Sequence, residues 1–372
     1  MKYCSSCVLP DTRPNLVIES DGICNACKNH RNKPHIDWPQ REKAFRKIVE
    51  EAQRRSTGYD CLIPVSGGKD STWQTVKCLE YGLNPLTFTY APPLRTKLGR
   101  SNLDNLIDLG VDHIDYRINP KTEATFLLKS FRRFGNCGTP MHTAIFSISR
   151  MLANRFRIPL IIWGEDSSAE YGGKKDTGAE FELDKAWLKK FGVSHGTGAV
   201  DWVDEDLTAK MMTPYFGASD EELAESGTAS IFLGYFFKWD PEESRRVAVE
   251  NGMKIKEDGA RTGFYNYADL DDEFIAVHHW LKWYKFGFTR LFDNLSIEIR
   301  NGRMTRDEAL AVIRASGDQR PVDDIKAFCS FTKISEDEFF AIAEQFRNRD
   351  IWSNEGGTWK MKDFILPDWT WA

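Results

Sequence analysis

A single stretch of the chain, CLIPVSGGKDST at residues 61–72, decides the fold. Its first part, Cys61–Val65, is a short apolar run of the kind that forms a buried strand. Its end opens an amphipathic pattern over Thr72–Tyr81, which Gly82 stops. Pro64 cannot donate to a sheet ladder, so we place it at the strand's end, where the chain bends. The stretch therefore predicts a strand, a loop and a helix in direct succession.

The loop between this strand and helix has residue types that bind phosphate. Two adjacent glycines, Gly67 and Gly68, let backbone N–H groups approach an anion closely, and the helix N-terminus adds partial positive charge. Asp70 would be repelled by bare phosphate, so we expect it to hold Mg²⁺. The remaining side chains offer two hydroxyl groups and one ammonium group, from Ser66, Ser71 and Lys69.

Two other interpretations of this loop were weighed. A Walker A loop requires G-x-x-x-x-G-K-[ST], whereas here Asp70 follows Lys69 and no glycine lies five positions before Gly68. A glycine-rich turn without a ligand is the simpler alternative. The strand–loop–helix context and the lysine favour a phosphate site over that turn.

From about residue 58 to 255, short apolar runs alternate with amphipathic helices, a pattern typical of parallel α/β proteins. The predicted helices include Thr72–Tyr81, Ser101–Leu109 and Met141–Phe156. We expect a doubly wound parallel sheet. Its predicted strands are Cys61–Val65, Leu86–Tyr90, His113–Ile118, Leu160–Trp163 and Ile231–Phe237.

Four cysteines near the N-terminus form two knuckles, Cys4-x-x-Cys7 and Cys24-x-x-Cys27, with sixteen residues between them. This spacing is typical of a four-thiolate tetrahedral zinc site. A segment of about 35 residues buries too little apolar surface alone, so the metal would supply much of its folding energy. Because all four positions are filled, we expect the zinc to be structural. An iron–sulfur cluster or a redox pair could use the same thiolates.

The chain organisation follows from these segments. We predict a zinc-ribbon-like segment at 1–35, a linker helix at 36–57, an α/β domain at 58–267 and an all-helical region at 268–372. Asp240-Pro241 reads as a helix start, and Thr305–Glu308 and Ser335–Glu338 read as capping boxes. We interpret the tryptophans of the last 21 residues as tail packing against the body: Trp352, Trp359, Trp369 and Trp371.

Composition excludes several classes. A net charge of -5 gives no overall attraction to nucleic acid or an acidic membrane surface. No stretch approaches the roughly 18 apolar residues of a membrane span, and the N-terminus lacks the apolar part of a signal peptide. We therefore expect a cytoplasmic protein whose eight cysteines are reduced.

The phosphate loop, Ser66-Gly67-Gly68-Lys69-Asp70-Ser71, resembles the signature of the PP-loop, or N-type, ATP pyrophosphatases. That group includes the synthetase domains of GMP, NAD and asparagine synthetases and tRNA-modifying relatives. The resemblance implies a HUP or adenine nucleotide alpha hydrolase-like fold, cleavage of ATP between the α- and β-phosphates, and Lys69 and Asp70 as catalytic residues. It also implies adenosine along the ends of the first strands, at Val65, Thr89, Tyr90, Gly164 and Glu165.

The order of parts is similar to the N-acetyl sugar amidotransferase family. The opening residues 4–14, the Gly- and Asp-rich loop from Gly164-Glu165-Asp166 and the stretch Ile231–Phe236 extend that similarity along the chain. It implies that ATP adenylylates the acetamido oxygen of a nucleotide-linked sugar, and that ammonia then gives an acetamidino group in bacterial surface polysaccharide biosynthesis. Glu165 or Asp166 would bind metal or position ammonia, with simple loop capping as the alternative.

The chain has no recognisable glutaminase. Cys137 follows Gly135-Asn136 as in a nucleophile elbow, but Thr139 stands where the second glycine should be, and Lys2 replaces an N-terminal cysteine. The family resemblance implies ammonia from a glutaminase and barrel partner resembling the histidine-biosynthesis synthase. Cys137 could instead carry sulfur, although a buried structural thiol is the commoner role.

Two rival functions remain open from sequence. The first is a tRNA-modifying ATP pyrophosphatase that thiolates a base or forms lysidine, which the acidic balance disfavours. The second is a non-catalytic adenine-nucleotide sensor, which the presence of both Lys69 and Asp70 disfavours.

Overall fold

The computed structural model describes residues 1–164, 170, 194–317 and 320–371. The helices are α1 (Asn25–Asn32), α2 (Trp38–Arg55), α3 (Lys69–Glu80), α4 (Lys97–Ile107), α5 (Pro120–Phe134), α6 (Thr139–Phe156), α9 (Thr213–Phe216), α10 (Asp220–Ser226), α11 (Leu233–Phe236), α12 (Pro241–Glu250), α13 (Ile275–Phe286), α14 (Arg290–Arg300), α15 (Arg306–Ser316), α16 (Val322–Thr332) and α17 (Glu336–Gln345), with 3-10 turns η1 (Lys33–His35) and η2 (Ala199–Trp202). The strands are β1 (Cys61–Pro64), β2 (Pro85–Tyr90), β3 (Asp112–Tyr116), β4 (Leu160–Trp163), β5 (Ala229–Phe232), β6 (Trp352–Glu355) and β7 (Thr358–Met361).

The central sheet has the strand order β3-β2-β1-β4-β5, and every pair in it is parallel. Leu62 of β1 aligns with Leu86 of β2 on one side and with Ile161 of β4 on the other. The order reverses between β1 and β4, which is where open α/β sheets bind ligands, beyond the carboxyl ends of the strands. The predicted phosphate loop follows β1 and therefore lies at this point.

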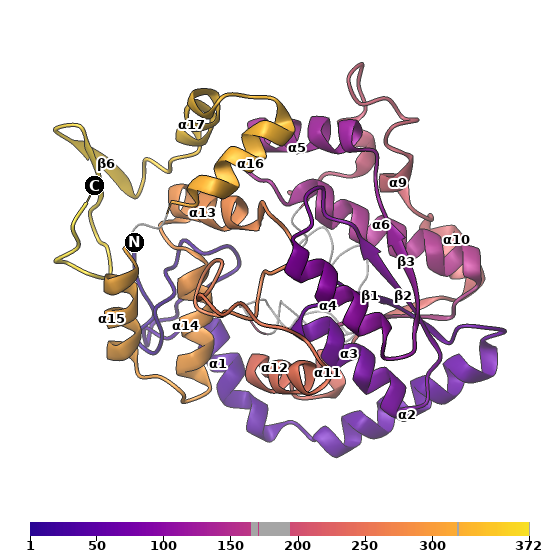
Figure 1. Cartoon of the computed structure of the whole chain (residues 1–372). Coiled ribbons are helices and arrows are strands. Elements are labelled where there is room, and N and C mark those ends of the chain that lie inside the picture. Colours follow the sequence, from indigo (N-terminus) through magenta and orange to yellow (C-terminus); the bar gives the residue numbers. More distant parts are fainter. Residues whose placement is uncertain (165–169, 171–193, 318–319, 372) are drawn as a thin grey trace.

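Helices cover both faces of the sheet, as Figure 1 shows. Successive residues of a strand point to opposite faces. Accordingly, Ile63 of β1 packs in a cluster with Phe45 of α2 and Leu103 of α4. Leu62 packs in a second cluster with Ile148 of α6. The predicted mixed α/β fold with a parallel sheet is confirmed, and its helices lie on both faces.

The last predicted strand, Ile231–Phe237, is wrong in its second half. The strand ends at Phe232, and residues 233–236 form the single turn of α11. Phe236 leaves the sheet to pack against Phe45 of α2, with ring centroids 5.5 Å apart, while the Gly234 N–H bonds the Gly164 carbonyl at 3.0 Å. An apolar run shared between a strand and a helical turn has no periodicity that separates the two.

The observed helices begin at their capping residues, and not at the first residue of their apolar pattern. The helix predicted from Ser101 begins at Lys97, because the Thr96 hydroxyl accepts from the Gly99 N–H at 2.8 Å. The caps predicted at Asp240 and at Thr305–Glu308 are present, and the Ser335 hydroxyl accepts from the Glu338 N–H at 3.1 Å. No helix in the described part of the chain is long and apolar enough to cross a membrane.

The expectation of an all-helical region after residue 268 is wrong near the end of the chain. Strands β6 and β7 form an antiparallel hairpin whose turn contains Gly356 and Gly357, both with positive φ. Consecutive glycines suit the turns of tight hairpins, so the signal was present in the sequence. Helices α13 to α17 make up the rest of this region (Figure 1).

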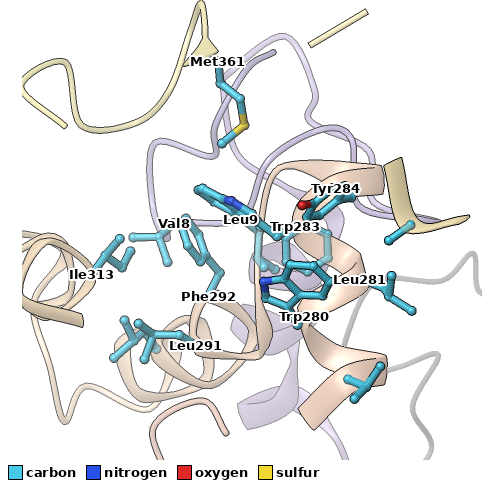
Figure 2. Close-up of a cluster of buried hydrophobic side chains, with 14 of the residues drawn as sticks. Val8, Leu9, Trp280, Leu281, Trp283, Tyr284, Leu291, Phe292, Ile313 and Met361 are labelled. Atoms are coloured by element: carbon cyan, nitrogen blue, oxygen red, sulfur yellow. The ribbon is translucent and has the colours of Figure 1, made fainter. Parts of the chain in front are cut away.

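The cysteine-rich segment does not have a core of its own. Its residues Val8 and Leu9 pack in one hydrophobic cluster with α13, α14 and the tail (Figure 2). Trp283 of α13 lies at the centre, in edge contact with Trp352 at 5.4 Å and stacked near Trp371 at 6.4 Å. The predicted packing of the tail tryptophans against the body is therefore observed. The predicted domain limits stay predictions.

Candidate functional site

The phosphate loop is held by its own side chains and by a close approach to α4. Gly67 has a φ of 82°, and a Cβ there would lie 2.5 Å from the Leu103 nitrogen, so only glycine fits. The Ser66 hydroxyl accepts from the Gly68 N–H at 3.3 Å, and the Ser71 hydroxyl donates to the Gly68 carbonyl at 3.0 Å. Gly68 is the N-cap residue of α3. The two serines thus shape the loop before any ligand arrives.

Lys69 and Asp70 form an ion pair at the start of α3. The Lys69 side chain is 10% exposed, and the second Asp70 oxygen accepts from the Trp239 indole N–H at 2.9 Å. Both carboxylate oxygens therefore have donors in this state. A phosphate group that takes the Lys69 ammonium would release one Asp70 oxygen for a metal ion. Trp239, just before α12, was not foreseen, because nothing local marks it as a partner of the loop.

A cavity of about 230 Å³ opens at this loop. One wall is the predicted loop, and the other comes from residues about 200 positions later, between Tyr267 and Asp271, together with Arg290 at the start of α14. Gly99 allows the two walls to meet, because a Cβ there would lie 2.5 Å from the Asp271 Cα. The Thr96 N–H also bonds the Asp271 carbonyl at 3.1 Å. The distant wall was not predicted.

The distant wall carries strongly perturbed charges. Burial alone would raise the pKa of Asp269, but Arg290 and His279 beside it hold that pKa well below its usual range. The Arg290 Nε lies 3.3 Å from an Asp269 oxygen. For Asp271, burial raises the pKa to about 6, and the charge of Asp269 adds to the rise. Groups with shifted pKa values in a cavity are typical of functional sites.

The charge balance of the cavity indicates what it can hold. Its lining includes the cations Lys69 and Arg290 and the carboxylates Asp70, Asp269 and Asp271. Two cations face three carboxylates, so a bare triphosphate would meet side chains whose charges already sum to a negative value. Carboxylate and phosphate oxygens are the ligands that Mg²⁺ prefers. The residues present therefore fit a phosphate ligand accompanied by Mg²⁺.

The residues expected to follow adenosine lie at the carboxyl ends of strands but outside the cavity lining. The Thr89 hydroxyl donates to the Val65 carbonyl at 2.6 Å, which ties β2 to the start of the loop. Tyr90 is buried at the end of β2 and lines a different cavity. Gly164 follows β4, and Glu165 and Asp166 lie outside the described residues. The adenosine roles stay predictions.

The four N-terminal cysteines converge as their spacing predicts. All four are buried, and their Sγ atoms lie within 4.8 Å of one another, at Cys4, Cys7, Cys24 and Cys27. The Cys7 and Cys24 sulfurs are 3.9 Å apart, far longer than a disulfide bond. Tetrahedral zinc with Zn–S bonds of about 2.3 Å places its sulfurs about 3.8 Å apart. The cluster therefore fits a closed zinc site.

Groups around the cluster favour thiolates. The Cys24 N–H donates to the Cys4 sulfur at 3.2 Å, and the Cys27 N–H donates to the Cys24 sulfur at 3.4 Å. Burial opposes the charge of Arg300, yet Cys7 and Cys27 nearby raise its pKa. A zinc ion with four thiolates has a net charge of -2, which this guanidinium partly balances. Such surrounding groups are a normal part of metal sites.

Cys137 and the histidines show no sign of a nucleophile. Burial raises the pKa of the Cys137 thiol, so it stays protonated. Cys137 is therefore better described by the other prediction, that of a buried structural thiol. His195 has its Nε2 2.7 Å from the Asn136 amide nitrogen and stacks on Phe134.

Comparison with known proteins links the C-terminal part of the chain to one family. Residues 261–365 match the family described as "LPS biosynthesis protein WbpG-like, C-terminal domain". No curated protein matches the chain. Among solved structures, NMN synthetase from Francisella tularensis aligns with 14% identity and a TM-score of 0.29, over 60% of this chain and 89% of that one. That likeness is too distant to bear on the site. The matched residues 261–365 include the distant wall of the phosphate-loop cavity.

Proposed function

We propose that the chain is a PP-loop ATP pyrophosphatase, an AMP-forming amidotransferase that converts the acetamido group of a nucleotide-linked N-acetyl sugar into an acetamidino group. The supporting observation is the cavity in which the glycine loop after β1 meets Lys69, Arg290 and three carboxylates. The match of residues 261–365 to a lipopolysaccharide biosynthesis family supports a role in bacterial surface polysaccharide synthesis.

The roles of the cavity residues follow from their charges. The backbone N–H groups of Gly67 and Gly68 and the N-terminus of α3 hold the pyrophosphate part of ATP. Lys69 and Arg290 neutralise the charge that develops as pyrophosphate leaves. Asp70 and Asp271 would hold Mg²⁺ through their carboxylate oxygens, and the ion would supply positive charge that stabilises the departing pyrophosphate. Asp269 keeps Arg290 in position through its ion pair.

The reaction proceeds in two displacements. The acetamido oxygen attacks the α-phosphorus of ATP, the bond to the bridging oxygen of the β-phosphate breaks, pyrophosphate leaves, and the amide nitrogen loses its proton. Ammonia then attacks the activated carbon, the carbon–oxygen bond breaks, and AMP leaves with that oxygen. Loss of one proton from the new nitrogen leaves the neutral acetamidino group. Activation is needed because an amide oxygen is otherwise a poor leaving group.

Ammonia would come from a separate glutaminase and barrel partner resembling the histidine-biosynthesis synthase. The sequence offers no glutaminase elbow, and the buried Cys137 thiol with its raised pKa cannot act as the nucleophile of one. Free ammonium at high concentration should replace the partner in a purified system.

Pyrophosphate release tests the proposal. The purified protein receives ATP, Mg²⁺ and ¹⁵N-ammonium with either acetamido nucleotide sugars or bulk tRNA, and Lys69→Ala serves as the inactive control. We expect release that depends on a sugar, with ¹⁵N found in that sugar by mass spectrometry. Release that depends on tRNA would assign the protein to the tRNA-modifying enzymes. ATP binding without release in either case would make it a nucleotide sensor.

A further inference from the structure

A second, smaller cavity lies beside the phosphate-loop cavity. Its volume is about 30 Å³, enough for one small molecule the size of water. The apolar part of its lining includes Tyr90, Leu127, Met141 and Phe274. The polar part comes from α5, from the loop before α6, from the segment before α13 and from the first turn of α13. It consists of Glu123, Cys137, Asp272 and His278.

Glu123 is the unusual member of this lining. It is 2% exposed, and its Oε1 is buried with no hydrogen-bond partner among the described residues. A buried carboxyl oxygen without a donor is costly and calls for a ligand. Burial raises the pKa of Glu123 to about 9, and the charge of Asp272 adds to the rise. The side chain therefore lacks a cation at close range.

The other polar groups do not supply that cation. Asp272 accepts the Phe274 N–H at 2.8 Å, and burial raises its pKa to about 7. Burial lowers the pKa of His278 well below its usual value, so its ring is neutral, and its Nδ1 has no partner in the described part of the chain. Arg261 acts on Asp272 from a distance but is engaged with Glu273 and Asp324.

The two cavities share one short segment. Asp269 and Asp271 line the phosphate-loop cavity, while the next residue, Asp272, lines the smaller one. Tyr90, which also lines the smaller cavity, ends the strand next to β1. A small molecule held between Glu123 and Asp272 would therefore contact the residue that follows Asp271 of the phosphate-loop cavity.

We propose that the smaller cavity binds one ammonium ion between Glu123 and Asp272 and takes its proton. Ammonium is close to water in size, so it fits the volume, and its N–H groups supply the donors that Glu123 lacks. An N–H bond breaks, the proton passes to the Asp272 carboxylate, and the nitrogen keeps the electron pair with which ammonia attacks. This proposal rests on the amidotransferase function proposed above and names where its nitrogen enters.

A binding test uses thallium(I), a monovalent cation of nearly the same radius as ammonium, and does not depend on turnover. Crystals of the full chain are soaked in thallium acetate, and anomalous scattering locates the ion. We expect a peak between Glu123 and Asp272 that ammonium chloride displaces and that is absent in Glu123→Gln. Asp272→Asn provides a second variant if Glu123→Gln fails to fold. A cavity that holds only water would overturn the proposal.

A kinetic test measures ammonium saturation of sugar-dependent pyrophosphate release. Bound ammonium would hold Glu123 in its ionised form, so Glu123→Gln removes one charge-assisted hydrogen bond. It should raise the apparent KM for ammonium about tenfold without changing the KM for ATP. Glu205→Gln, an exposed carboxylate elsewhere, is the matched control. An unchanged KM for ammonium in both Glu123→Gln and Asp272→Asn would contradict the proposal.

The two tests separate this proposal from the one on which it rests. A thallium peak in a protein that shows no sugar-dependent turnover would support the cation pocket and contradict the amidotransferase function. Normal ammonium-dependent turnover without a thallium peak would support the amidotransferase function and contradict the cation pocket.

Discussion

The cysteine cluster and the phosphate-loop cavity are the two candidate sites for a charged ligand, and they are assembled differently. All four members of the cluster come from residues 4–27, one short piece of chain. The cavity joins residues 66–71 to a wall near residues 267–271 and to Arg290. The cysteine motif contains every residue of its site, whereas the phosphate-loop motif contains only one of the two walls of its cavity. A short motif can therefore indicate which ligand a site binds without indicating the distant residues that complete the site.

The difference extends to stability. The cluster gains its burial from distant partners, since Val8 and Leu9 pack on α13 and α14 (Figure 2). The elements around the cavity meet through close backbone approaches at Gly67 and Gly99. We expect damage to the cluster to affect folding first and damage to the cavity to affect catalysis first.

The largest effect should come from breaking the cysteine cluster. Cys24→Ser removes one thiolate, and we expect loss of zinc and of about 5 kcal/mol or more, because structural zinc contributes roughly 10 to 16 kcal/mol in small domains. Metal analysis and urea unfolding measure the two losses. Cys329→Ser, a buried cysteine outside the cluster, is the control and should cost about 1 kcal/mol. Equal losses in both variants, or iron in place of zinc, would contradict the assignment.

These two sites also show what the sequence could predict. The cysteine spacing was sufficient to predict the cluster of Cys4, Cys7, Cys24 and Cys27. Each C-x-x-C pair forms one turn of the chain, and that turn brings its two sulfurs together. The glycine loop was sufficient for its own half of the cavity, because a strand, a loop and a helix N-terminus follow directly in the chain. Arg290 and Asp271 could not be predicted, since no local pattern marks which loop packs against Gly99.

The fold shows the same division. Four of the strand positions follow from apolar runs, because those runs are bounded by turn formers. The helical turn at 233–236 was missed, because Phe236 packs on Phe45, a contact across about 190 positions. The hairpin at 352–361 had a local signal in Gly356-Gly357, which the surrounding helical pattern obscured.

The next largest effect compares the two walls of the cavity directly. Lys69→Ala and Asp70→Ala remove the local wall's charges, and Arg290→Ala removes the distant cation. We expect each to lower kcat for pyrophosphate release by about 10²–10³-fold, the usual result of removing one group that stabilises developing charge. Lys77→Ala should have no such effect, because this half-buried side chain pairs with Glu80 near the other end of α3. Normal pyrophosphate release from Asp70→Ala would contradict a catalytic role for Asp70. Normal pyrophosphate release from Arg290→Ala would mean that the functional residues are confined to the phosphate loop.

A smaller effect should separate backbone strain from close approach. Gly67 and Gly110 both have positive φ, at 82° and 95°, but only Gly67 has a neighbour where a Cβ would lie. Gly110→Ala should cost about 1 kcal/mol from the left-handed backbone alone. Gly67→Ala should cost about 2 to 4 kcal/mol, because Leu103 must also shift. Urea unfolding of both variants measures this, and equal costs would mean that α4 yields easily at the cavity.

The smallest effect concerns the two aspartates of the distant wall, which should respond to pH with opposite sign. The folded pKa of Asp271 is about 6, against about 3.9 in an unfolded chain, so its ionisation opposes folding as pH rises from 4 to 6. Asp271→Asn should therefore match the wild type near pH 4 and be more stable by about 2 to 3 kcal/mol well above pH 6. Asp269 has a lowered pKa, because Arg290 and His279 outweigh its burial, so its ionised form stabilises the fold above pH 4. Asp269→Asn should lose stability there, as measured by urea unfolding at a series of pH values. Shifts of the same sign in both variants would mean that Arg290 pairs with the two carboxylates alike, and the distant wall would then be a single charge cluster instead of one anchoring group and one group free for a metal ion.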